Sequence, residues 1–244
     1  MPVFHGFIPA RFASTRFPGK PLAMIHGRPM FAHVYDRALA SGVLHAVHLC
    51  TDDERIWAKA LELDIPVVMT GADHASGTDR ILEAADRVGI PDSAVVINIQ
   101  GDEPAIPPAM IREVAELFCS EEVRVGTLAR AVGREEASDP DVVKVVLSAD
   151  GRALYFSRSM IPFFRSGEDE RFLAHVGLYA FRMEALRTFG VLGRGLLERI
   201  ECLEQLRLLE AGIPIHVALT EHRSRGVDKP SDIDFITCTL GEEL

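Results

Sequence analysis

Apolar runs that alternate with helical segments constrain the fold of this chain more than any other feature. The clearest run is 94–99, AVVINI, whose unbroken apolar pattern is typical of a strand buried on both faces of a sheet. Other strand-like runs are 3–8, 43–50 and 66–69, and helices are expected over 30–40, 54–63, 81–88 and 107–118. Because strand and helix follow one another, the sequence predicts right-handed crossovers and an α/β fold with a largely parallel sheet.

The middle third of the chain, 123–190, departs from this alternation. Its strand-like segments are 124–132, 143–148, 153–156 and 174–182, and an Asp150-Gly151 pair separates the second from the third. Asp-Gly between two such runs is typical of a β-hairpin. We therefore expect an antiparallel, β-rich extension of the sheet, and we interpret 123–190 as a subdomain that forms the interface of a homodimer.

A single helix is expected over 196–209. Its apolar side chains recur at helical spacing, at Leu196, Ile200, Leu203 and Leu206. The polar residues between them are predicted to lie mostly on the solvated face, and they include Glu201, Glu204 and Gln205. A strand over 215–219 and a last helix from Ser231 complete the prediction.

Length and composition favour one domain that spans residues 1–244, since 48 % of the residues are hydrophobic. The 26 Lys and Arg against 36 Asp and Glu leave a net charge of −10. This balance argues against nonspecific binding of nucleic acid, because that binding depends on excess positive charge. No apolar run is long enough to span a membrane, and the first residues do not resemble a signal peptide. We therefore expect no membrane insertion and a cytoplasmic location.

The four cysteines are far apart and form no CxxC pair, so we expect reduced thiols rather than a zinc site or disulfides. Cys50 and Cys238 lie in apolar runs and are predicted to belong to the core.

The cationic loop, residues 8–22 with the sequence IPARFASTRFPGKPL, directly follows the first predicted strand. Its three prolines disfavour a helix, and it carries the fixed charges of Arg11, Arg16 and Lys20. Open α/β sheets bind ligands at the carboxyl ends of their strands, so this loop is well placed to hold phosphate groups. The alternative is a solvated basic loop. The sequence is neither a P-loop nor a GxGxxG dinucleotide motif.

Two aspartates are candidate metal ligands. Asp102 follows the 94–99 strand within QGDEP, and a carboxylate at the end of a central strand suits a Mg²⁺ ion that bridges nucleotide phosphates. Asp228 lies far along the chain within GVDKP. Each has a simpler interpretation, as a turn aspartate or as a residue that leads into a helix.

Two further segments are candidate ligand walls. The polar stretch 70–80, TGADHASGTDR, precedes a helix that Ser76 or Thr78 is expected to cap, and its small residues can also present backbone groups to a flat base. In the strand 174–182, His175 and Tyr179 fall on one face with a glycine between them. A lone histidine there is typically a packed or surface residue, whereas two polar residues beside a glycine that removes bulk fit a ligand wall.

Together these segments resemble one family. In chain order they are IPARFASTRFPGKPL, TDD, SGTDR, NIQGDEP, ALYFSR, HVGLY, ECLEQLR and GVDKP. They are similar to the motifs of the 3-deoxy-manno-octulosonate (Kdo) cytidylyltransferases, also called CMP-Kdo synthetases. The resemblance implies a three-layer αβα sandwich with a mostly parallel, Rossmann-like sheet of the nucleotide-diphospho-sugar transferase type. It also implies the reaction CTP + Kdo → CMP-Kdo + pyrophosphate, with Mg²⁺ as cofactor, in lipopolysaccharide biosynthesis.

The resemblance assigns roles residue by residue. It implies catalytic roles for Lys20, Arg11, Asp102 and Asp228, the two aspartates as Mg²⁺ ligands. It implies nucleotide contacts for Pro9, Ala10, Arg11, Arg16, Lys20, Ser76, Gly77, Arg80 and Gln100. It implies contacts to the sugar acid for Gln100, Arg158, His175, Tyr179, Glu204 and Gln205, with Arg158 as the partner of the sugar carboxylate. The family is usually dimeric.

Some positions depart from the family pattern, among them Ala174, where many relatives have Arg, and Phe181, where Tyr is frequent. They leave the sugar open between Kdo and 8-amino-3,8-dideoxy-manno-octulosonate, although the STR of the cationic loop favours Kdo. A sialate cytidylyltransferase is disfavoured, because that family has a GSKxxPxKN-like first motif. A non-catalytic nucleotide-binding regulator has little need for both Asp102 and Asp228. A purely structural protein would leave the cationic loop unexplained.

Overall fold

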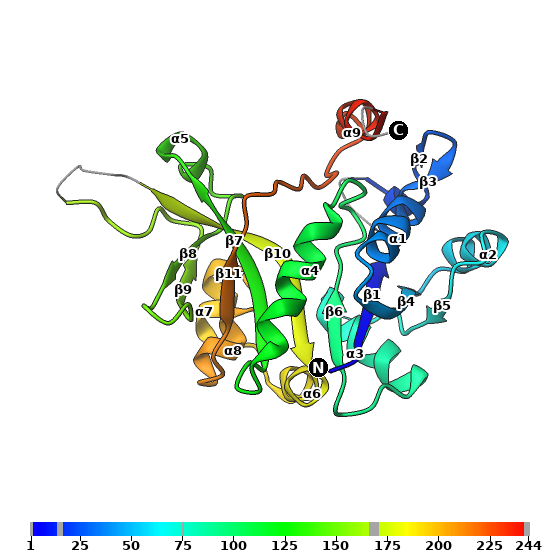
Figure 1. Cartoon of the computed structure of the whole chain (residues 1–244). Coiled ribbons are helices and arrows are strands. Elements are labelled where there is room, and N and C mark those ends of the chain that lie inside the picture. Colours follow the sequence, from blue (N-terminus) through cyan, green and yellow to red (C-terminus); the bar gives the residue numbers. More distant parts are fainter. Residues whose placement is uncertain (1, 14–16, 75, 166–170, 242–244) are drawn as a thin grey trace.

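The computed structural model describes residues 2–13, 17–74, 76–165 and 171–241. A nine-stranded sheet forms its centre, in the order β11-β7-β10-β6-β1-β4-β5, with β8 attached to β10 and β9 to β8 (Figure 1). The strands are β1 (Phe4–Ala10), β4 (Leu44–Thr51), β5 (Val67–Met69), β6 (Val95–Asn98), β7 (Val125–Val132), β8 (Lys144–Leu147), β9 (Ala153–Ser157), β10 (Phe172–Arg182) and β11 (His216–Leu219).

The predicted parallel sheet is confirmed. β1 pairs in parallel with both β4 and β6, and β5 extends the sheet beyond β4. β10 runs antiparallel to β6 and to β7, while β11 is parallel to β7. The sheet is therefore mostly parallel around β1 and carries an antiparallel extension, as the sequence predicted.

Alternate side chains of each strand pack on opposite faces of the sheet, and this alternation builds three layers. On β1, the buried Ile8 joins a core cluster with the helices α1 (Met30–Ala40), α2 (Glu54–Glu62) and α4 (Pro108–Glu116). The adjacent residue, Phe7, joins a second cluster with α3 (Gly77–Val88), α6 (Met183–Val191) and α8 (Leu206–Glu210). Both side chains are fully buried. The helices α1 and α3 lie on either side of β1 (Figure 1), so the αβα sandwich is confirmed.

The hairpin predicted at Asp150-Gly151 is also confirmed. β8 and β9 pair antiparallel, and Gly151 adopts a positive φ of 80° that favours glycine. β8 joins the main sheet through Lys144, which lies opposite Ala174 of β10. The hairpin stands out at one side of the molecule (Figure 1). Whether it forms a subunit interface stays a prediction.

The single helix predicted over 196–209 is wrong. Cys202 adopts the left-handed conformation with φ 53° and ψ 46°, which ends α7 (Leu196–Glu201), and α8 begins only at Leu206. Leu203 and Leu206 are buried, whereas Leu196 is exposed, as is Ile200, so the apolar residues do not form one stripe. The break brings Glu204 and Gln205 toward the protein interior instead of the solvated face.

The C-terminal helix α9 (Asp232–Gly241) begins one residue after the predicted start. Its buried Ile236 and Leu240 pack on Ile25 and Val227, beside the small hairpin of β2 (Met24–Ile25) and β3 (Arg28–Pro29). This packing returns the end of the chain to the cationic loop (Figure 1). Three short elements complete the fold: η1 (Lys20–Leu22), η2 (Leu117–Cys119) and α5 (Arg134–Ala137).

No described helix is both long enough and apolar enough to cross a membrane. All four cysteines are free thiols, as expected. Cys50 is buried, but the core position predicted for Cys238 is wrong because this residue is exposed on α9.

Candidate active site

A cavity of about 290 Å³ opens where β1 and β6 end. Its lining comes from the cationic loop, the stretch 70–80, the QGDEP turn and the segment before α9, and comprises Pro9, Ala10, Arg11, Lys20, Pro21, His74, Ser76, Gly77, Arg80, Gln100, Gly101, Asp102 and Asp228. Every nucleotide-contacting residue implied by the family resemblance is in this set except Arg16, which lies outside the described residues.

The cavity depends on a close approach between the ends of β1 and β6. A Cβ atom at Gly101 would lie 2.4 Å from the carbonyl oxygen of Pro9, so only glycine fits there. A Cβ atom at Gly77 would lie 3.3 Å from the Pro9 ring, which allows the start of α3 to pack closely on the same residue. Pro9 therefore packs between Gly101 and Gly77, and both glycines lie close to it.

Lys20 joins three parts of the chain. Its ammonium group donates to Oδ2 of Asp102 at 2.6 Å and to the carbonyl oxygen of Val227 at 2.8 Å. The backbone N–H of Val227 in turn donates to the carbonyl oxygen of Asp102 at 2.9 Å. These bonds bring together the cationic loop, the QGDEP turn and the GVDKP segment. Residues that are far apart in the sequence therefore line one cavity.

Asp228 lines the same cavity as Asp102. The N–H groups of Asp228 and Lys229 both donate to Oδ2 of Asp232 at 2.9 Å, which fixes the turn before α9. Mg²⁺ sites in nucleotide-binding proteins commonly use one or two carboxylates and complete their shell with phosphate and water oxygens. Two carboxylates on a cavity with a cationic loop fit that requirement. The described residues hold no group of three or more metal-ligating side chains, so phosphate and water oxygens would supply the remaining ligands.

The start of α3 is built as predicted, with Ser76 as its cap. Ser76 Oγ accepts the N–H of Asp79 at 3.1 Å and donates to the Asp79 carboxylate at 2.9 Å. The guanidinium of Arg80 is buried and donates to Oγ1 of Thr70 at 2.6 Å and to Oδ2 of Asp52 at 3.0 Å. Arg80 therefore lines the cavity and also links α3 to Thr70 and Asp52.

His74 lines the cavity too, and our sequence-based site did not include it. Its Nε2 pairs with the carboxylate of Glu83, which also accepts the backbone N–H of Gly71 at 2.9 Å. Glu83 thereby ties the stretch 70–80 to α3. The sequence offered little indication of this pair, because His74 lies before the predicted start of the helix and Glu83 lies inside it.

Gln100, which lines the cavity, donates from its Nε2 to the carbonyl oxygen of Gly177 on β10 at 3.0 Å. His175 and Tyr179 of the predicted wall are not among the residues that line the cavity, so their contact with a ligand stays a prediction.

His175 and Tyr179 lie side by side with ring centroids 5.2 Å apart. Their spacing predicted only a shared face, since residues four apart on a regular strand lie about 13 Å from each other. The irregularity of β10 between Val176 and Tyr179 brings the two rings together. Burial lowers the pKa of His175 to about 3 and raises the pKa of Tyr179 well above its usual range. Both side chains are therefore neutral. A Cβ atom at Gly177 would lie 3.8 Å from Cγ of Gln100, an ordinary contact distance, so packing within the described protein does not require glycine there. That Gly177 clears space for a ligand stays a prediction.

Arg158 follows β9 and is held firmly. Its Nε donates to the carbonyl oxygen of Glu201 at 2.9 Å, its Nη1 donates to the carbonyl oxygen of Pro140 at 3.0 Å, and its backbone N–H donates to the Glu201 carboxylate. The buried Lys144 donates to the carbonyl oxygen of Arg158 at 2.6 Å. Lys144 and Glu201 therefore position Arg158, although it does not line the cavity described above.

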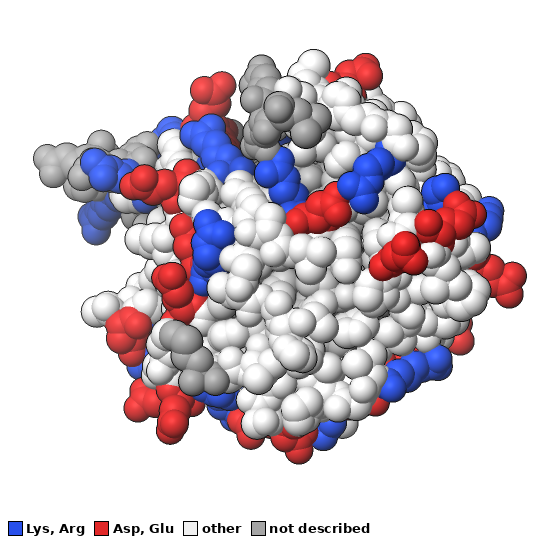
Figure 2. All heavy atoms as spheres, turned by 45° about the vertical axis from the view of Figure 1, so that its right-hand side comes forward, with Lys and Arg blue, Asp and Glu red and all other residues white. Residues whose placement is uncertain are grey.

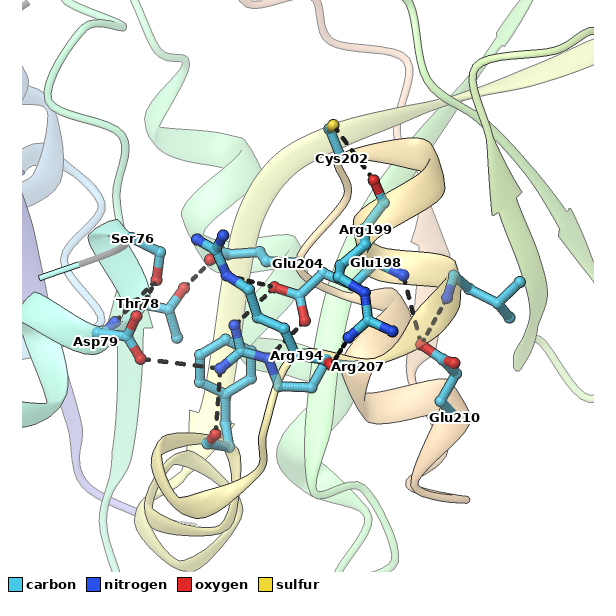
Figure 3. A network of polar contacts seen from close by, with 12 residues as sticks. Ser76, Thr78, Asp79, Arg194, Glu198, Arg199, Cys202, Glu204, Arg207 and Glu210 are labelled. Carbon is cyan, nitrogen blue, oxygen red and sulfur yellow. Dashed lines mark hydrogen bonds and ion pairs between the residues drawn. The ribbon is translucent and has the colours of Figure 1, made fainter.

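Glu204 contacts the start of α3 (Figure 3). Thr78 Oγ1 donates to the Glu204 carboxylate at 2.6 Å, and burial raises the pKa of Glu204. The adjacent Gln205 is buried. Behind Glu204, the buried Arg207 makes two hydrogen bonds to Glu198, at 2.6 and 2.9 Å. This network joins the helices α7 and α8 to the start of α3, where Ser76 and Gly77 line the cavity.

Charge on the surface is mixed. On the face drawn in Figure 2, Lys and Arg side chains lie next to Asp and Glu side chains instead of forming one continuous positive region. The cationic loop is therefore a local concentration of positive charge on a chain whose net charge is −10. A small polyanion such as a triphosphate suits this arrangement better than an extended one.

Comparison with known proteins agrees with this geometry. A cytidylyltransferase family model matches residues 6–217. A 3-deoxy-manno-octulosonate cytidylyltransferase of Nitratidesulfovibrio vulgaris is 57% identical over 242 residues, 98% of this chain and 96% of the relative. The protein of the same name from Lawsonia intracellularis is 47% identical over 244 residues, 100% of this chain and 96% of the relative. An 8-amino-3,8-dideoxy-manno-octulosonate cytidylyltransferase of Shewanella amazonensis is 47% identical over 229 residues, 93% of this chain and 94% of the relative.

Among solved structures, a CMP:2-keto-3-deoxy-manno-octonic acid synthetase complexed with CTP superposes with a TM-score of 0.94 at 40% identity and covers 99% of this chain and 100% of that one. A 4-diphosphocytidyl-2C-methyl-D-erythritol synthase, at 12% identity, shares the fold with a TM-score of 0.67 over 98% of this chain and 99% of that one. Fold and site thus define a nucleotidyltransferase of the cytidylyltransferase class. Within that class, the chain belongs to the 3-deoxy-manno-octulosonate cytidylyltransferase family.

Proposed function

We propose that this chain transfers CMP from CTP to Kdo. The anomeric hydroxyl of Kdo attacks the α-phosphorus in line, the bond from that phosphorus to the bridging oxygen of pyrophosphate breaks, and the hydroxyl proton is released. The observation that carries the proposal is the cavity at the ends of β1 and β6, which is lined by residues of the family's motifs. The chain that contains these motifs is 57% identical to a 3-deoxy-manno-octulosonate cytidylyltransferase. In such a site the protein contributes mainly positioning and charge neutralisation.

The cationic side of the cavity supports this assignment for the triphosphate. Arg11 and Lys20 both line it and supply positive charge where phosphate oxygens would lie. Lys20 is fixed by Asp102, so its ammonium is preorganised rather than free to rotate. Asp102 and Asp228 would hold Mg²⁺. When bound, the ion neutralises phosphate charge and lowers the pKa of the attacking hydroxyl.

We assign the sugar acid to the side of the cavity that faces β10. Gln100 lies on that side and bonds to β10. The other residues assigned to the sugar acid are His175 and Tyr179 of β10, and Glu204 and Gln205 of the α7–α8 connection. The partner assigned to the sugar carboxylate is Arg158. Its Nη2 has no hydrogen-bond partner within the part of the chain that the structure describes, while its Nε and Nη1 are anchored. A guanidinium held in this way can present a fixed donor to a carboxylate.

The 8-amino sugar acid is the second candidate acceptor, because a relative named for that substrate is 47% identical over 93% of this chain. The two acceptors differ at C8, where one carries a neutral hydroxyl and the other an amine that is protonated at neutral pH. Higher identity to relatives named for Kdo favours the first.

We further propose that the protein acts in the cytoplasm in lipopolysaccharide biosynthesis and that it is a homodimer. The antiparallel extension supports the dimer. Beyond Ala153, whose N–H donates to the carbonyl oxygen of Ile215, no described strand pairs with the edge of β9 opposite β8, so that edge can pair with a partner.

The direct test measures pyrophosphate release with CTP or UTP against Kdo and the 8-amino sugar acid, in Mg²⁺. We expect turnover with CTP and Kdo above all other pairs. Preference for the 8-amino acceptor would replace the proposed acceptor, and the absence of turnover with every pair would overturn the proposal. Sedimentation at micromolar concentration tests the dimer, which a monomer would contradict.

A further inference from the structure

An aromatic ring braces the cationic loop. The side chain of Phe12 is half-buried and packs on the core cluster that Ile8 shares with α1, α2 and α4. Its ring lies directly against Gly19, where a Cβ atom would come within 2.9 Å of the ring. The N–H of Gly19 donates to the carbonyl oxygen of Phe12 at 2.9 Å. Phe12 therefore holds the residue that directly precedes Lys20 through its backbone and through its ring.

The guanidinium of Arg55, on α2, covers the same ring and lies 3.3 Å from its centroid. This distance is within the range of a cation–π contact. The side chain of Arg55 is 60% exposed, so the contact forms at the surface and is not forced by packing in the core. It joins α2 to the cationic loop, which otherwise belongs to a different strand–helix unit.

Arg55 is itself fixed. Its Nε donates to Oδ1 of Asp53 at 3.0 Å, and its Nη2 donates to Oδ2 at 2.6 Å. Asp53 also caps α2 by accepting the backbone N–H of Arg55 at 3.0 Å, and its own N–H donates to Oγ1 of Thr51 at the end of β4. A carboxylate that holds a guanidinium with two parallel bonds fixes the plane of that group.

A continuous series of contacts thus runs from the end of β4 through Asp53, Arg55 and Phe12 to Gly19. Resting on the function proposed above, we propose that Arg55 and Phe12 are positioning residues for the phosphate-binding part of the cationic loop: by holding Gly19, they set the place of the Lys20 ammonium relative to the triphosphate. Within the described part of the chain, the Lys20 ammonium is held by Asp102 and the carbonyl oxygen of Val227, and no hydrogen bond or ion pair joins Arg55 or Phe12 to these two groups. Their effect on the reaction passes through the backbone.

The proposal predicts kinetics that a purely stabilising contact would not produce. Arg55→Ala is expected to lower kcat about tenfold, since small misplacements of a positioned group have effects of this order, while the KM for the acceptor stays unchanged. Phe12→Leu, which removes the ring, is expected to have the same effect, and Phe12→Tyr, which keeps it, is expected to retain wild-type kcat. Because Arg55 is exposed, the melting temperature should stay close to that of the wild type.

A double-mutant cycle locates the effect. If Arg55 acts through Lys20, adding Arg55→Ala to Lys20→Ala lowers kcat no further, whereas independent roles give multiplied losses. The matched control is Arg187→Ala on α6, because Arg187 is also an exposed arginine that pairs with carboxylates, here of Asp86 and Asp92. The control variant should keep wild-type kcat.

Hydrogen exchange provides a readout that needs no turnover. The Gly19 amide is protected by its bond to Phe12, and Arg55→Ala is expected to speed its exchange at least about fivefold. Unchanged exchange, or multiplied losses in the double mutant, would overturn the positioning role. If the wild type turns over no nucleotide while Gly19 exchange still rises in Arg55→Ala, the proposed function is wrong but the bracing of the loop by Arg55 stands.

Discussion

The ammonium of Lys20 and the carboxylate of Asp102 are 2.6 Å apart, although the two residues are 82 positions apart in the sequence. The pair is partly buried, with side-chain exposures of 15% and 37%. It connects the residue assigned to the phosphates with the residue assigned to the metal. In the proposed reaction Asp102 therefore has two tasks, to orient Lys20 and to ligate Mg²⁺.

Lys20→Ala tests stabilisation of the leaving group. If the ammonium neutralises charge that develops on pyrophosphate, kcat falls more than CTP binding weakens, because only contacts that strengthen in the transition state raise the rate. Loss of one such contact is expected to cost about 3 kcal/mol, or about a hundredfold in kcat. Steady-state kinetics with varied CTP give both constants. A raised KM with an intact kcat would show that Lys20 only docks the substrate.

Asp228→Asn tests the proposed Mg²⁺ site. The variant keeps the size of the side chain but loses its charge, so we expect a normal fold by circular dichroism and loss of nearly all turnover at limiting Mg²⁺. Asp234→Asn is the matched control, because Asp234 is an exposed acid in the first turn of α9 on the same segment. Near-normal activity of Asp228→Asn would contradict a metal site with two carboxylates.

Much of the fold could be predicted because it depends on local patterns. The buried strands around Ile8 and 94–99 are apolar without interruption, and the Asp150-Gly151 turn needs a positive φ that Gly151 supplies. The break at Cys202 could not be predicted in this way. A left-handed cysteine has no local signal, and the surrounding sequence has good helical spacing. Tertiary contacts decide that region, because Leu203 and Leu206 are buried while Glu204 reaches Thr78 on another helix.

The same contrast holds for the site. Most residues that line the cavity lie in short motifs, so resemblance to a family located them without a structure, although it did not locate His74. Residues that hold those motifs in place carry no such signal. Glu83 orients His74, Lys144 holds Arg158, and Arg55 covers Phe12, and in each case the partner lies on a separate element. Such pairs follow from how helices and loops dock, which one sequence does not specify.

Arg207→Met tests how the α7–α8 connection is stabilised. Arg207 and Glu198 form an ion pair with side-chain exposures of 6% and 7% (Figure 3). Removal of the guanidinium leaves the buried Glu198 carboxylate without a positive partner at hydrogen-bond distance, and such a change typically costs about 3–5 kcal/mol. Urea unfolding measures the free energy of unfolding.

Arg194→Met is the control for this variant. Arg194 also faces Glu198, but at 3.8 Å and with its side chain 58% exposed. A pair at this distance with one solvent-exposed partner is expected to contribute at most about 1 kcal/mol, so this variant should be almost as stable as the wild type. If both variants lose the same free energy of unfolding, burial of the Arg207–Glu198 pair does not explain its contribution to stability.

The last prediction concerns acid stability and His175. Burial lowers the pKa of this residue from its ordinary value of 6.5 to about 3 in the folded protein. The unfolded chain therefore binds a proton at a pH where the folded protein does not, so acid favours unfolding. The stability associated with the neutral ring is fully present above pH 6.5 and is lost as the pH falls toward 3. At pH 5 the loss is about 2 kcal/mol, since each unit of pH below 6.5 costs about 1.36 kcal/mol.

His175→Asn isolates this contribution, because asparagine does not titrate but keeps a polar atom near Thr127 Oγ1, which lies 3.0 Å from Nε2 of His175. The pKa values of His5, His48 and His216 are also lowered by burial, so the variant still loses some stability in acid. Between pH 6.5 and pH 5, its free energy of unfolding should nevertheless fall less steeply than that of the wild type. The difference between the two slopes should correspond to the uptake of about one proton on unfolding. Urea unfolding at each pH measures the two slopes, and equal slopes would mean that His175 is charged in the folded protein and that the wall on β10 carries a positive charge.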